Sequence, residues 1–482
     1  MKVYLLNPPH YPRFGRSMRW QDTGRAGTLY YPIWLAYATG VLEQDHEVRL
    51  VDAPAWAWSR EKVKSDVERF KPDLLVIDSS FPSLKNDIGV ATELGEVTAA
   101  RTVLVGPPAS MFSENILSND GIDIVARYEY DCTVKEIADG LENGADLKKV
   151  KGISYKKNGE ILHNANRDFL SSDELDKIPY VSKSYKTHLN IHDYFLGSSL
   201  YPEVQIFTGR GCPFKCTFCS WPQTFMGGTY RVRSVSNLLD ELEWIQENLD
   251  VKEVFFEDDT FTVDKKRVNA FCEGYLERKL DVSWACNARV DLDYPLMKEM
   301  EQANCRLLIV GYESGNDEIL QKIRKGIKVA QSRQLAENAR KAGLLIHGDF
   351  IIGLPGETKE TINVTKAFIK EVKPDILQVS VASPFPGTEF YQWCQENGYL
   401  VTDDPNEYLD MDGHQRAIVS YPWLSNEDIT KAVDEILRGY YLSVNYVPAA
   451  FRQVCRKHGF DELRRLLFSA KMFFGYESRR AG

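Results

Sequence analysis

One stretch of this sequence indicates both a fold and a chemistry: Gly209-Arg210-Gly211-Cys212-Pro213-Phe214-Lys215-Cys216-Thr217-Phe218-Cys219. It follows a short apolar stretch typical of a strand, so we expect a loop at the end of that strand. Cys212, Cys216 and Cys219 have the spacing Cys-x3-Cys-x2-Cys. Three thiolates can bind three irons of a 4Fe-4S cluster, whereas an electron-transfer cluster normally has four cysteine ligands. The spacing therefore predicts a cluster with one open iron, and an open position is typical of a catalytic metal.

The alternative for these cysteines is a structural zinc knuckle. Such a site needs a fourth Cys or His nearby, and the nearest histidines, His192 and His347, are distant in sequence. The ligand count therefore favours the cluster. The other cysteines show no ligand spacing, and we interpret them as reduced thiols of a reducing compartment: Cys132, Cys272, Cys286, Cys305, Cys394 and Cys455.

The whole chain has the length of two to four domains, at 482 residues. It carries 59 Lys and Arg against 69 Asp and Glu, a net charge of −10. Such an acidic chain has no general attraction to nucleic acid. Its apolar runs are shorter than a membrane span needs, and residues 1–7 predict a first strand rather than a signal peptide. We therefore expect a cytoplasmic protein.

Residues 1–145 alternate short β-branched runs with helical stretches, which predicts an α/β domain with a doubly wound parallel sheet. The expected strands are Val3–Asn7, Val48–Asp52, Leu74–Asp78, Thr102–Gly106 and Asp123–Ala126. Residues 146–200 are predicted to form a connector that contains a hairpin at Gly152–His163. In a doubly wound sheet, ligands bind beyond the carboxyl ends of the strands.

Residues 201–395 contain six successive strand–helix units, and each strand ends in a polar or Gly-rich cluster. The predicted strands are Val204–Phe207, Glu253–Phe256, Val282–Cys286, Leu307–Val310, Leu344–Ile352 and Ile376–Val381. Polar groups gathered at the carboxyl ends of parallel strands form the mouth of a (β/α) barrel. Six units instead of eight predict a partial, TIM-type (β/α)6 barrel.

Residues 396–482 are predicted to be helical, most clearly at Asn426–Tyr440 and Gly459–Phe474. Residues 452–480 hold eight basic and three acidic residues among many apolar ones. An amphipathic stretch of this kind usually packs on its own domain and leaves its charges in solvent. The alternative is a peripheral contact with a membrane or with a lipid substrate.

Four further stretches, with the cysteine loop, resemble the radical S-adenosylmethionine (SAM) enzymes that carry an N-terminal cobalamin-binding-type domain: Cys219–Thr224, Phe255–Thr262, Val310–Asn316 and Ile352–Thr358. Within that group the sequence is similar to the hopanoid-biosynthesis enzyme associated with the cyclitol-ether head group, and to the apramycin-pathway diol dehydratase. The resemblance implies a 4Fe-4S cluster and SAM as cofactors, and an electron donor such as flavodoxin or ferredoxin. It also implies that SAM is cleaved to a 5′-deoxyadenosyl radical.

The resemblance assigns SAM contacts residue by residue. Asp258 and Asp259 would bind the SAM amino group, although Asp-Asp-Thr can also simply cap the next helix. Arg289 would bind the methionine carboxylate, a role for which Arg231 and Arg233 compete. The remaining contacts, to adenine, ribose or carboxylate, would come from Phe218, Asn287, Glu313, Ser314, Ile351 and Gly353.

Three side chains are candidates for contact with the substrate. His347 and Asp349 share one face of a strand by its two-residue periodicity, as a polar pair in the barrel or as an ordinary buried histidine with its neighbour. Cys286 ends the third barrel strand, where its thiol would return a hydrogen atom to a product radical or fill the core as a small hydrophobe.

The N-terminal domain departs from its relatives at two turns, Val105–Ser110 and Arg127–Asp131. Pro, Arg and Tyr stand there in place of glycines that let the backbone approach a bulky cofactor. The departures favour a domain without cobalamin, and so hydrogen abstraction from a sugar or polyol, such as an aminoglycoside or a lipid-linked sugar, followed by rearrangement, dehydration or epimerisation. The alternative function is a cobalamin-dependent radical SAM methyltransferase. An RNA methylthiotransferase is disfavoured by the acidic charge, and a non-catalytic cobalamin or metal sensor is the fourth hypothesis.

Overall fold

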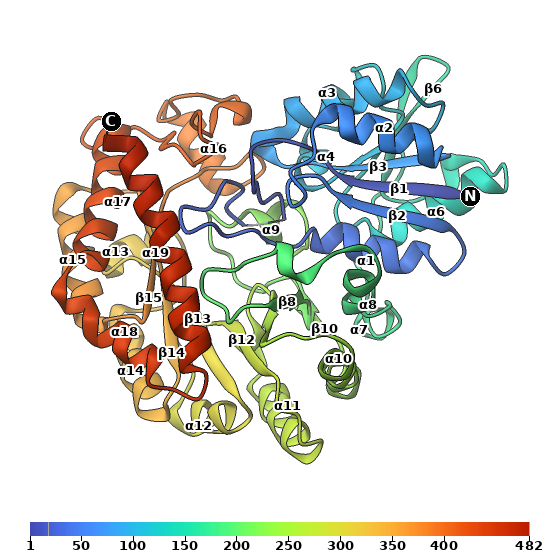
Figure 1. Ribbon diagram of the computed structural model, residues 1–482. Coiled ribbons are helices and arrows are strands. Elements are labelled where there is room, and N and C mark those ends of the chain that lie inside the picture. The colour runs from blue at the N-terminus through green and yellow to red at the C-terminus, as the bar shows by residue number, and fades with distance from the viewer. Residues whose placement is uncertain (18, 482) are drawn as a thin grey trace.

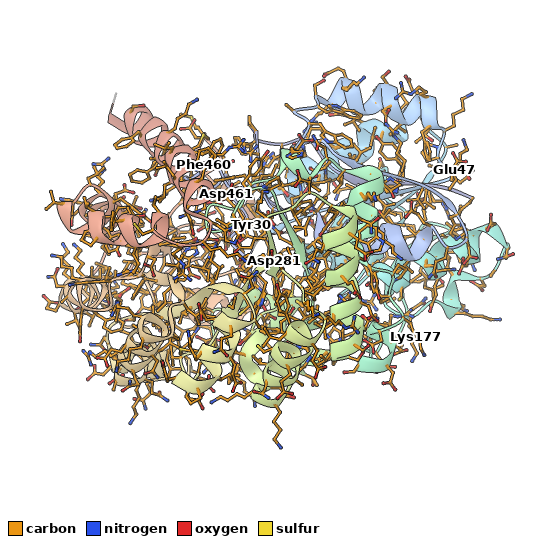
Figure 2. All side chains as sticks on the ribbon, turned by 60° about the horizontal axis from the view of Figure 1, so that its bottom comes forward. Tyr30, Glu47, Lys177, Asp281, Phe460 and Asp461 are labelled. Carbon is orange, nitrogen blue, oxygen red and sulfur yellow. The ribbon has the colours of Figure 1, made fainter. Side chains whose placement is uncertain are left out.

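The computed structural model describes residues 1–17 and 19–481, apart from the side chains of 445, 477 and 479–481. Two α/β lobes lie side by side, and Figure 1 shows the N-terminal sheet in blue and the second sheet in green to orange. The segment of residues 8–32 leaves the first lobe after β1 and returns to it at α1. Tyr30 of this segment lies near the middle of the molecule (Figure 2).

The first sheet has seven strands in the order β2-β1-β3-β4-β5-β6-β7. Its parallel strands are β1 (Lys2–Asn7), β2 (Glu47–Asp52), β3 (Leu74–Asp78), β4 (Arg101–Val105) and β5 (Ile124–Ala126). The helices between them are α1 (Ile33–Leu42), α2 (Arg60–Phe70), α3 (Leu84–Gly95), α4 (Pro107–Met111), α5 (Ser113–Leu117) and α6 (Asp131–Glu142). The strand order reverses at β1, so the predicted doubly wound sheet is confirmed.

The hairpin of β6 (Ile153–Lys157) and β7 (Glu160–His163) extends this sheet, with β6 antiparallel to β5. The sequence placed it in the connector, because an isolated hairpin does not reveal its partner strand. Arg127 binds it to the sheet through the carbonyl oxygen of Ile153, at 2.8 Å. The chain then passes through α7 (Ser172–Leu175) and α8 (Val181–His188) to the second sheet.

The second sheet has six parallel strands in the order β15-β14-β13-β12-β11-β8, so neighbours in sequence are neighbours in space. The strands are β8 (Glu203–Ile206), β11 (Glu253–Phe256), β12 (Ser283–Ala288), β13 (Cys305–Glu313), β14 (Leu345–Ile352) and β15 (Ile376–Val381). Helices of this lobe are α9 (Ser220–Thr224), α10 (Val235–Asn248), α11 (Lys265–Glu277), α12 (Tyr294–Gln302), α13 (Asp317–Lys322), α14 (Val329–Ala342), α15 (Lys359–Val372) and α16 (Glu389–Glu396). The edge strands β8 and β15 do not pair with each other, which confirms a partial barrel.

The two faces of this sheet have different neighbours. Phe255, Ala285 and Leu307 form a small cluster on the inner face. Residues one position further along, such as Phe256 and Cys286, join the large core beneath the helices. Strand side chains alternate between faces, so the inner face holds Asn287 beyond Ala285.

Three helices complete the chain: α17 (Asn426–Tyr441), α18 (Val447–Val454) and α19 (Gly459–Ala481). They lie together on one flank of the barrel, drawn in red in Figure 1. This confirms the predicted helical C-terminal region. Among the residues that the structure describes, no helix is long and apolar enough to cross a membrane.

A buried charge network joins α19 to the barrel. The Arg306 guanidinium on β13 donates to Glu253 at 2.6 Å and to Glu462 at 2.8 Å. Glu462 also accepts from Arg465, at 2.9 Å. All four side chains are buried, so each charge depends on its partners for compensation.

We predict that Arg306→Met strongly destabilises the protein, because it leaves Glu253 buried without its cation. Breaking such a pair costs about 3–5 kcal/mol of the free energy of unfolding. The control Arg278→Met removes a partly exposed cation near Asp240, and should cost less than about 1 kcal/mol. Urea unfolding followed by tryptophan fluorescence measures both losses. Equal losses for the two variants would contradict the prediction.

Candidate functional site

The cysteine loop lies at the carboxyl end of β8, as its position in the sequence predicts. Its base is a two-stranded ladder of β9 (Gly209–Arg210) and β10 (Arg231–Val232). Gly211 has φ +83°, and a Cβ on it would lie 2.3 Å from the Thr229 carbonyl oxygen. Only glycine fits this position, which fixes where the chain turns toward the first cysteine.

One side-chain amide holds the middle of the loop. The Nε2 of Gln223, on α9, donates to the carbonyl oxygens of Cys216 and Thr217 at 3.2 Å and of Cys219 at 2.7 Å. The Cys219 N–H donates to the Cys216 carbonyl at 3.3 Å, which closes the turn between these two cysteines. The backbone around the second and third cysteines is therefore shaped by residues outside the motif.

The three cysteines are half-buried in a partly acidic environment. Burial raises the pKa of the Cys212 thiol to about 12, and the Asp259 carboxylate adds to this shift. Burial also raises the pKa of Cys216 and of Cys219. Metal ions reverse such shifts because they bind the thiolate. No three His, Cys, Asp or Glu side chains of the described residues converge on a single-ion site, whereas a 4Fe-4S cluster binds each cysteine to a separate iron.

The two predicted aspartates at the end of β11 have different surroundings. Asp258 accepts hydrogen bonds at 2.6 Å from the N–H and the Oγ1 of Thr208 and from the Tyr230 hydroxyl. It therefore ties the end of β11 to β8. Asp259 lies near the cysteines and, with Glu257, binds a cation. Asp259 Oδ2 and Glu257 Oε2 are buried without a hydrogen-bond partner, so they can accept bonds from an ammonium group.

That cation is Arg19, from the 8–32 segment. Its guanidinium donates to Glu257 Oε1 at 2.5 Å and to Asp259 Oδ1 at 3.2 Å, and it lies 4.6 Å from the Trp221 ring centroid. Burial raises the pKa of Glu257 to about 7 in spite of this cation. The sequence analysis did not identify Arg19, because it stands in a loop without periodicity or motif.

A second basic group lies on the other side of the cysteine loop. The Arg289 guanidinium stacks 3.5 Å from the Phe214 ring centroid and donates to the Lys325 carbonyl at 3.0 Å. Lys325 Nζ donates to Glu313 Oε1 at 2.5 Å. The structure thus brings together Arg289 and Glu313 near Cys216. The competing Arg231 and Arg233 are bound elsewhere, to Glu129 and Glu241.

The other predicted SAM contacts lie at strand ends, with several engaged in structural bonds. Asn287 Nδ2 donates to the Asp258 carbonyl at 2.7 Å. Ser314 Oγ is buried, 3.2 Å from Thr365 Oγ1. Gly353 at the end of β14 has φ +100°, donates to Glu357 and accepts from Tyr421 at 2.8 Å. Ile351 is buried beside it in the core, and Phe218 is half-buried against the core.

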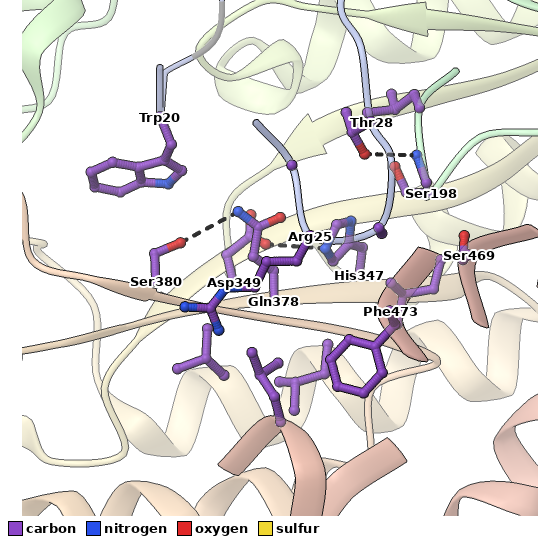
Figure 3. A pocket seen from close by; sticks show the side chains of 18 of the residues that line it. Trp20, Arg25, Thr28, Ser198, His347, Asp349, Gln378, Ser380, Ser469 and Phe473 are labelled. Carbon is purple, nitrogen blue, oxygen red and sulfur yellow. Dashed lines mark hydrogen bonds and ion pairs between the residues drawn. The ribbon is translucent and has the colours of Figure 1, made fainter. Parts of the chain in front are cut away.

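A cavity of about 340 Å³ occupies the inside of the half-barrel. Figure 3 shows its polar part, with His347, Asp349, Gln378 and Ser380 projecting from β14 and β15 and Trp20 and Arg25 from the 8–32 segment. Helices α17 and α19 supply apolar side chains at its other end, among them Leu437, Tyr441, Leu466, Phe473 and Phe474. The cavity therefore suits a small molecule with a polar and an apolar part.

His347 and Asp349 face each other in this cavity. Their Nε2 and Oδ1 atoms lie 3.3 Å apart without the alignment of a hydrogen bond, and both atoms lack other partners. Burial lowers the pKa of His347 to about 3 and raises the pKa of Asp349 well above its usual range. A neutral imidazole beside a protonated carboxyl can donate to and accept from an uncharged polar group.

Cys286 lies away from the cavity. It belongs to the core beneath the helices, next to Cys305, and is fully buried. The alternation of β12 places Ala285 and Asn287 on the inner face instead. The surroundings of Cys286 are those of a buried small hydrophobe rather than of a hydrogen donor to a bound substrate.

The carboxyl edge of the first sheet, where a cobalamin would bind, is filled by this chain's own side chains. Arg16 enters from the 8–32 segment and donates to Asn7 Oδ1 at 2.8 Å and to Asp87 at 2.6 Å, with both Arg16 and Asp87 buried. Phe81 stacks on Phe385 of the barrel, 5.4 Å between centroids. These contacts bring the 8–32 segment and the barrel onto the carboxyl edge of the first sheet.

The turn after β5 is also engaged. Glu129 binds Arg231 at 2.6 Å, and Asp131 binds Arg210 at 2.7 Å, so the turn fastens the first lobe to the ladder below the cysteine loop. A Cβ on Gly387 of the barrel would lie 2.3 Å from Met111 Sδ of the first lobe, which shows how closely the two lobes meet. The altered turn after β5 is therefore taken up by contacts between the two lobes.

Comparison with known proteins agrees with the cysteine loop and the barrel. Residues 206–369 match the radical SAM superfamily. The chain is 30% identical over 464 residues to an uncharacterized methyltransferase from Pyrococcus horikoshii, covering 95% of this chain and 96% of the relative. It is 24% identical to the cytidylyl-2-hydroxyethylphosphonate methyltransferase of Streptomyces wedmorensis, covering 91% and 90%.

The fold is similar to that of the radical SAM methyltransferase TsrM from Kitasatospora setae, solved with cobalamin and a 4Fe-4S cluster. The TM-score is 0.71 at 15% identity, over 99% of both chains. The two relatives from Pyrococcus horikoshii and Streptomyces wedmorensis, which cover more than nine-tenths of the chain, are both named methyltransferases. The predicted hydrogen abstraction from a sugar or polyol is therefore wrong, and the alternative, a cobalamin-dependent radical SAM methyltransferase, agrees better with them. On the match of its barrel and the identity along nearly its full length, this chain belongs to the radical SAM superfamily of iron–sulfur enzymes.

Proposed function

We propose that this chain is a radical SAM methyltransferase that modifies a small molecule in the barrel cavity. The position of this cavity supports the proposal. It is lined both by Arg19 and Asn287, which contact the acidic strand end beside the cysteines, and by the unpartnered His347–Asp349 pair. A molecule held there would lie between the cluster loop and two polar groups that can orient it.

The cofactors would be held by residues from different strand ends. Cys212, Cys216 and Cys219 would bind a 4Fe-4S cluster, and Asp259 with Glu257 would bind the ammonium of SAM. When bound, these groups supply reductive cleavage of a sulfonium C–S bond, and SAM supplies the methyl group. Arg19 neutralises the same carboxylates when no ammonium is present, so the acids are compensated in both states.

The other residues predicted to contact SAM would bind its carboxylate, ribose and adenine. Arg289 would bind the methionine carboxylate, because its guanidinium lies near Cys216 and keeps donors free. Glu313 and Asn287 would contact the ribose, Ser314 would position the end of β13, and Phe218, Ile351 and Gly353 would pack the adenine. A one-electron reductant such as flavodoxin or ferredoxin would be the protein partner.

Substrate orientation would fall to His347 and Asp349. Because burial lowers the pKa of His347 and raises that of Asp349, it disfavours the charged form of each, and they would hydrogen-bond a neutral polar group such as a hydroxyl or an amide. The similarity to the hopanoid head-group enzyme and the apramycin-pathway dehydratase stays a prediction. We infer that the contacts of Arg16 and Phe81 at the carboxyl edge of the first sheet take the place of cobalamin, so the transfer would not depend on it.

The proposal is tested by the transfer of a labelled methyl group. The reconstituted protein is incubated anaerobically with methyl-deuterated SAM, a reductant and cell extracts of polar or of lipid-like small molecules, with and without methylcobalamin. We expect S-adenosylhomocysteine and a labelled product, in equal amounts in both arms. Deoxyadenosine without label transfer would overturn methyl transfer, and a product that requires cobalamin would overturn the cobalamin-free site.

We predict that the cysteine loop binds the iron. Cys212→Ala, Cys216→Ala and Cys219→Ala should each remove most of the iron and of the visible absorbance after reconstitution, because each removes the ligand of one iron. The matched control is Cys455→Ala, since Cys455 is an exposed thiol in another part of the chain. Unchanged iron content in a loop variant would contradict the assignment.

We also predict that the adjacent aspartates respond differently to substitution. Asp259→Asn should weaken SAM binding by about tenfold or more, because a hydrogen bond to a charged group contributes about 1.5–3 kcal/mol. Asp258→Asn should instead lower the melting temperature, since Asp258 accepts three structural bonds. Equilibrium dialysis with labelled SAM, normalised to iron content, measures the first effect. Equal SAM affinity for Asp259→Asn and wild type would refute the assignment.

A further inference from the structure

The exposed apolar side chains of this protein gather at its C-terminal end. Of the sixteen large hydrophobic residues that are exposed in the described part of the chain, nine fall between residues 442 and 474. We call these nine the C-terminal patch: Leu442, Val444, Val447, Phe451, Phe460, Leu463, Leu467, Phe468 and Phe474. A cluster of this size is unusual for a surface that faces only water.

Helix α19 carries four of the nine residues of the patch on one stripe. Phe460, Leu463, Leu467 and Phe474 follow one another at three, four and seven residues, which places them on one face of a helix. Phe460 is 80% and Leu467 63% exposed. Phe460 stands in the first turn of α19, next to Asp461 (Figure 2).

The opposite side of α19 is fixed to the protein. Glu462 and Arg465 are buried in the network of Arg306. Phe468, at the border of the patch, packs with its ring 4.4 Å from that of Phe195. Met472 reaches Gly27 of the 8–32 segment. The helix is therefore held in place by contacts that do not involve Phe460, Leu463 or Leu467.

Helix α18 continues the patch beside α19. Val447 and Phe451 are spaced for one face of the helix and are 63% and 68% exposed, and Val444 precedes them at 83%. The two helices pack against each other. The apolar surface is thus carried by two neighbouring helices rather than by scattered side chains.

The charges around the patch are mostly positive. Arg464 and Lys471 are exposed and lie on the same face of α19 as Leu467, at the helical spacings of three and four residues. Glu462 is buried and paired, which leaves Asp461 as the acid of this region with solvent contact among the described side chains. The whole protein has a net charge of −10, so this surface differs in sign from the average.

The cavity opens at the patch. Leu442 and Phe474 line the cavity wall and are also exposed, each at 56%. Leu466 and Phe473, their neighbours on the inner side, line the cavity as well. The apolar wall of the cavity is therefore continuous with the apolar outer surface.

We propose that the C-terminal patch docks on the surface of a membrane that contains anionic lipids, and that the cavity takes an amphiphilic substrate from it. The proposal rests on the proposed function and adds the substrate class. Apolar side chains with flanking Arg and Lys are the composition of helices that lie in a membrane interface. The apolar part of the substrate would lie along α17 and α19, and its polar part would reach His347 and Asp349.

Flotation with lipid vesicles tests the docking without a catalytic readout. The wild-type holoenzyme should bind vesicles of phosphatidylcholine with phosphatidylglycerol, and bind pure phosphatidylcholine less. Phe460→Ser combined with Leu467→Ser should lower the partition coefficient by about tenfold or more, because each buried apolar side chain contributes more than 1 kcal/mol. Arg464→Gln with Lys471→Gln should reduce only the part that salt screens.

The matched control is Leu276→Ser with Val364→Ser, two exposed apolar residues of α11 and α15 outside the patch. It should bind vesicles like wild type. Absence of binding by wild type, or equal losses for the two double variants, would overturn the proposal. A dimer in analytical ultracentrifugation that Phe460→Ser with Leu467→Ser dissociates would also overturn it, because the patch would then cover a second copy.

The vesicle-binding test and the methyl-transfer test can fail independently of each other. Phe460 and Leu467 do not line the cavity, so their substitution should leave the iron content and the melting temperature unchanged. Vesicle binding without label transfer would support the docking surface and reject methyl transfer. Label transfer without vesicle binding would support methyl transfer and reject the docking surface.

Discussion

Two buried carboxylates at the mouth of the barrel require a cation. The position of that cation in the chain determines which segment covers the site. Glu257 and Asp259 lie beside the cysteines, and uncompensated charges there would be costly. Arg19 satisfies both. Because Arg19 belongs to the segment between β1 and α1, its ion pairs draw this segment across the barrel. The same segment then lines the cavity with Trp20, Arg25, Thr28 and Tyr30.

The pairing also explains why the lobes are so closely joined. Arg16, a few residues before Arg19, is buried with Asp87 on the first lobe. The segment is thus bound to both lobes, and it packs on the carboxyl edges of both sheets. The same stretch of chain therefore packs on the first sheet and lines the cavity of the second.

Local patterns in the sequence were sufficient for the sheets and for the cysteine loop, since strand periodicity and ligand spacing are read over a few residues. They were insufficient where the answer depends on which face of a strand curves inward. The sequence leaves two roles open for Cys286 on that account, a hydrogen donor or a buried small hydrophobe, and the structure places Ala285 rather than Cys286 on the inner face. Asp258 and Asp259 are adjacent, so a local pattern cannot give them different roles. Their roles differ because Thr208 and Tyr230, from other parts of the chain, bind Asp258. The reaction could not be fixed either, because one cluster loop serves many chemistries.

The enclosure of the cavity depends on both ends of the chain. Arg25 Nη1 donates to Asp434 Oδ1 at 3.2 Å across 409 residues, and α19 closes the wall beside Gly27. During synthesis the barrel strands and the cysteine loop leave the ribosome before α19 exists. Until α19 docks, the cavity wall that it supplies is missing, so the inner face of the barrel is open to solvent.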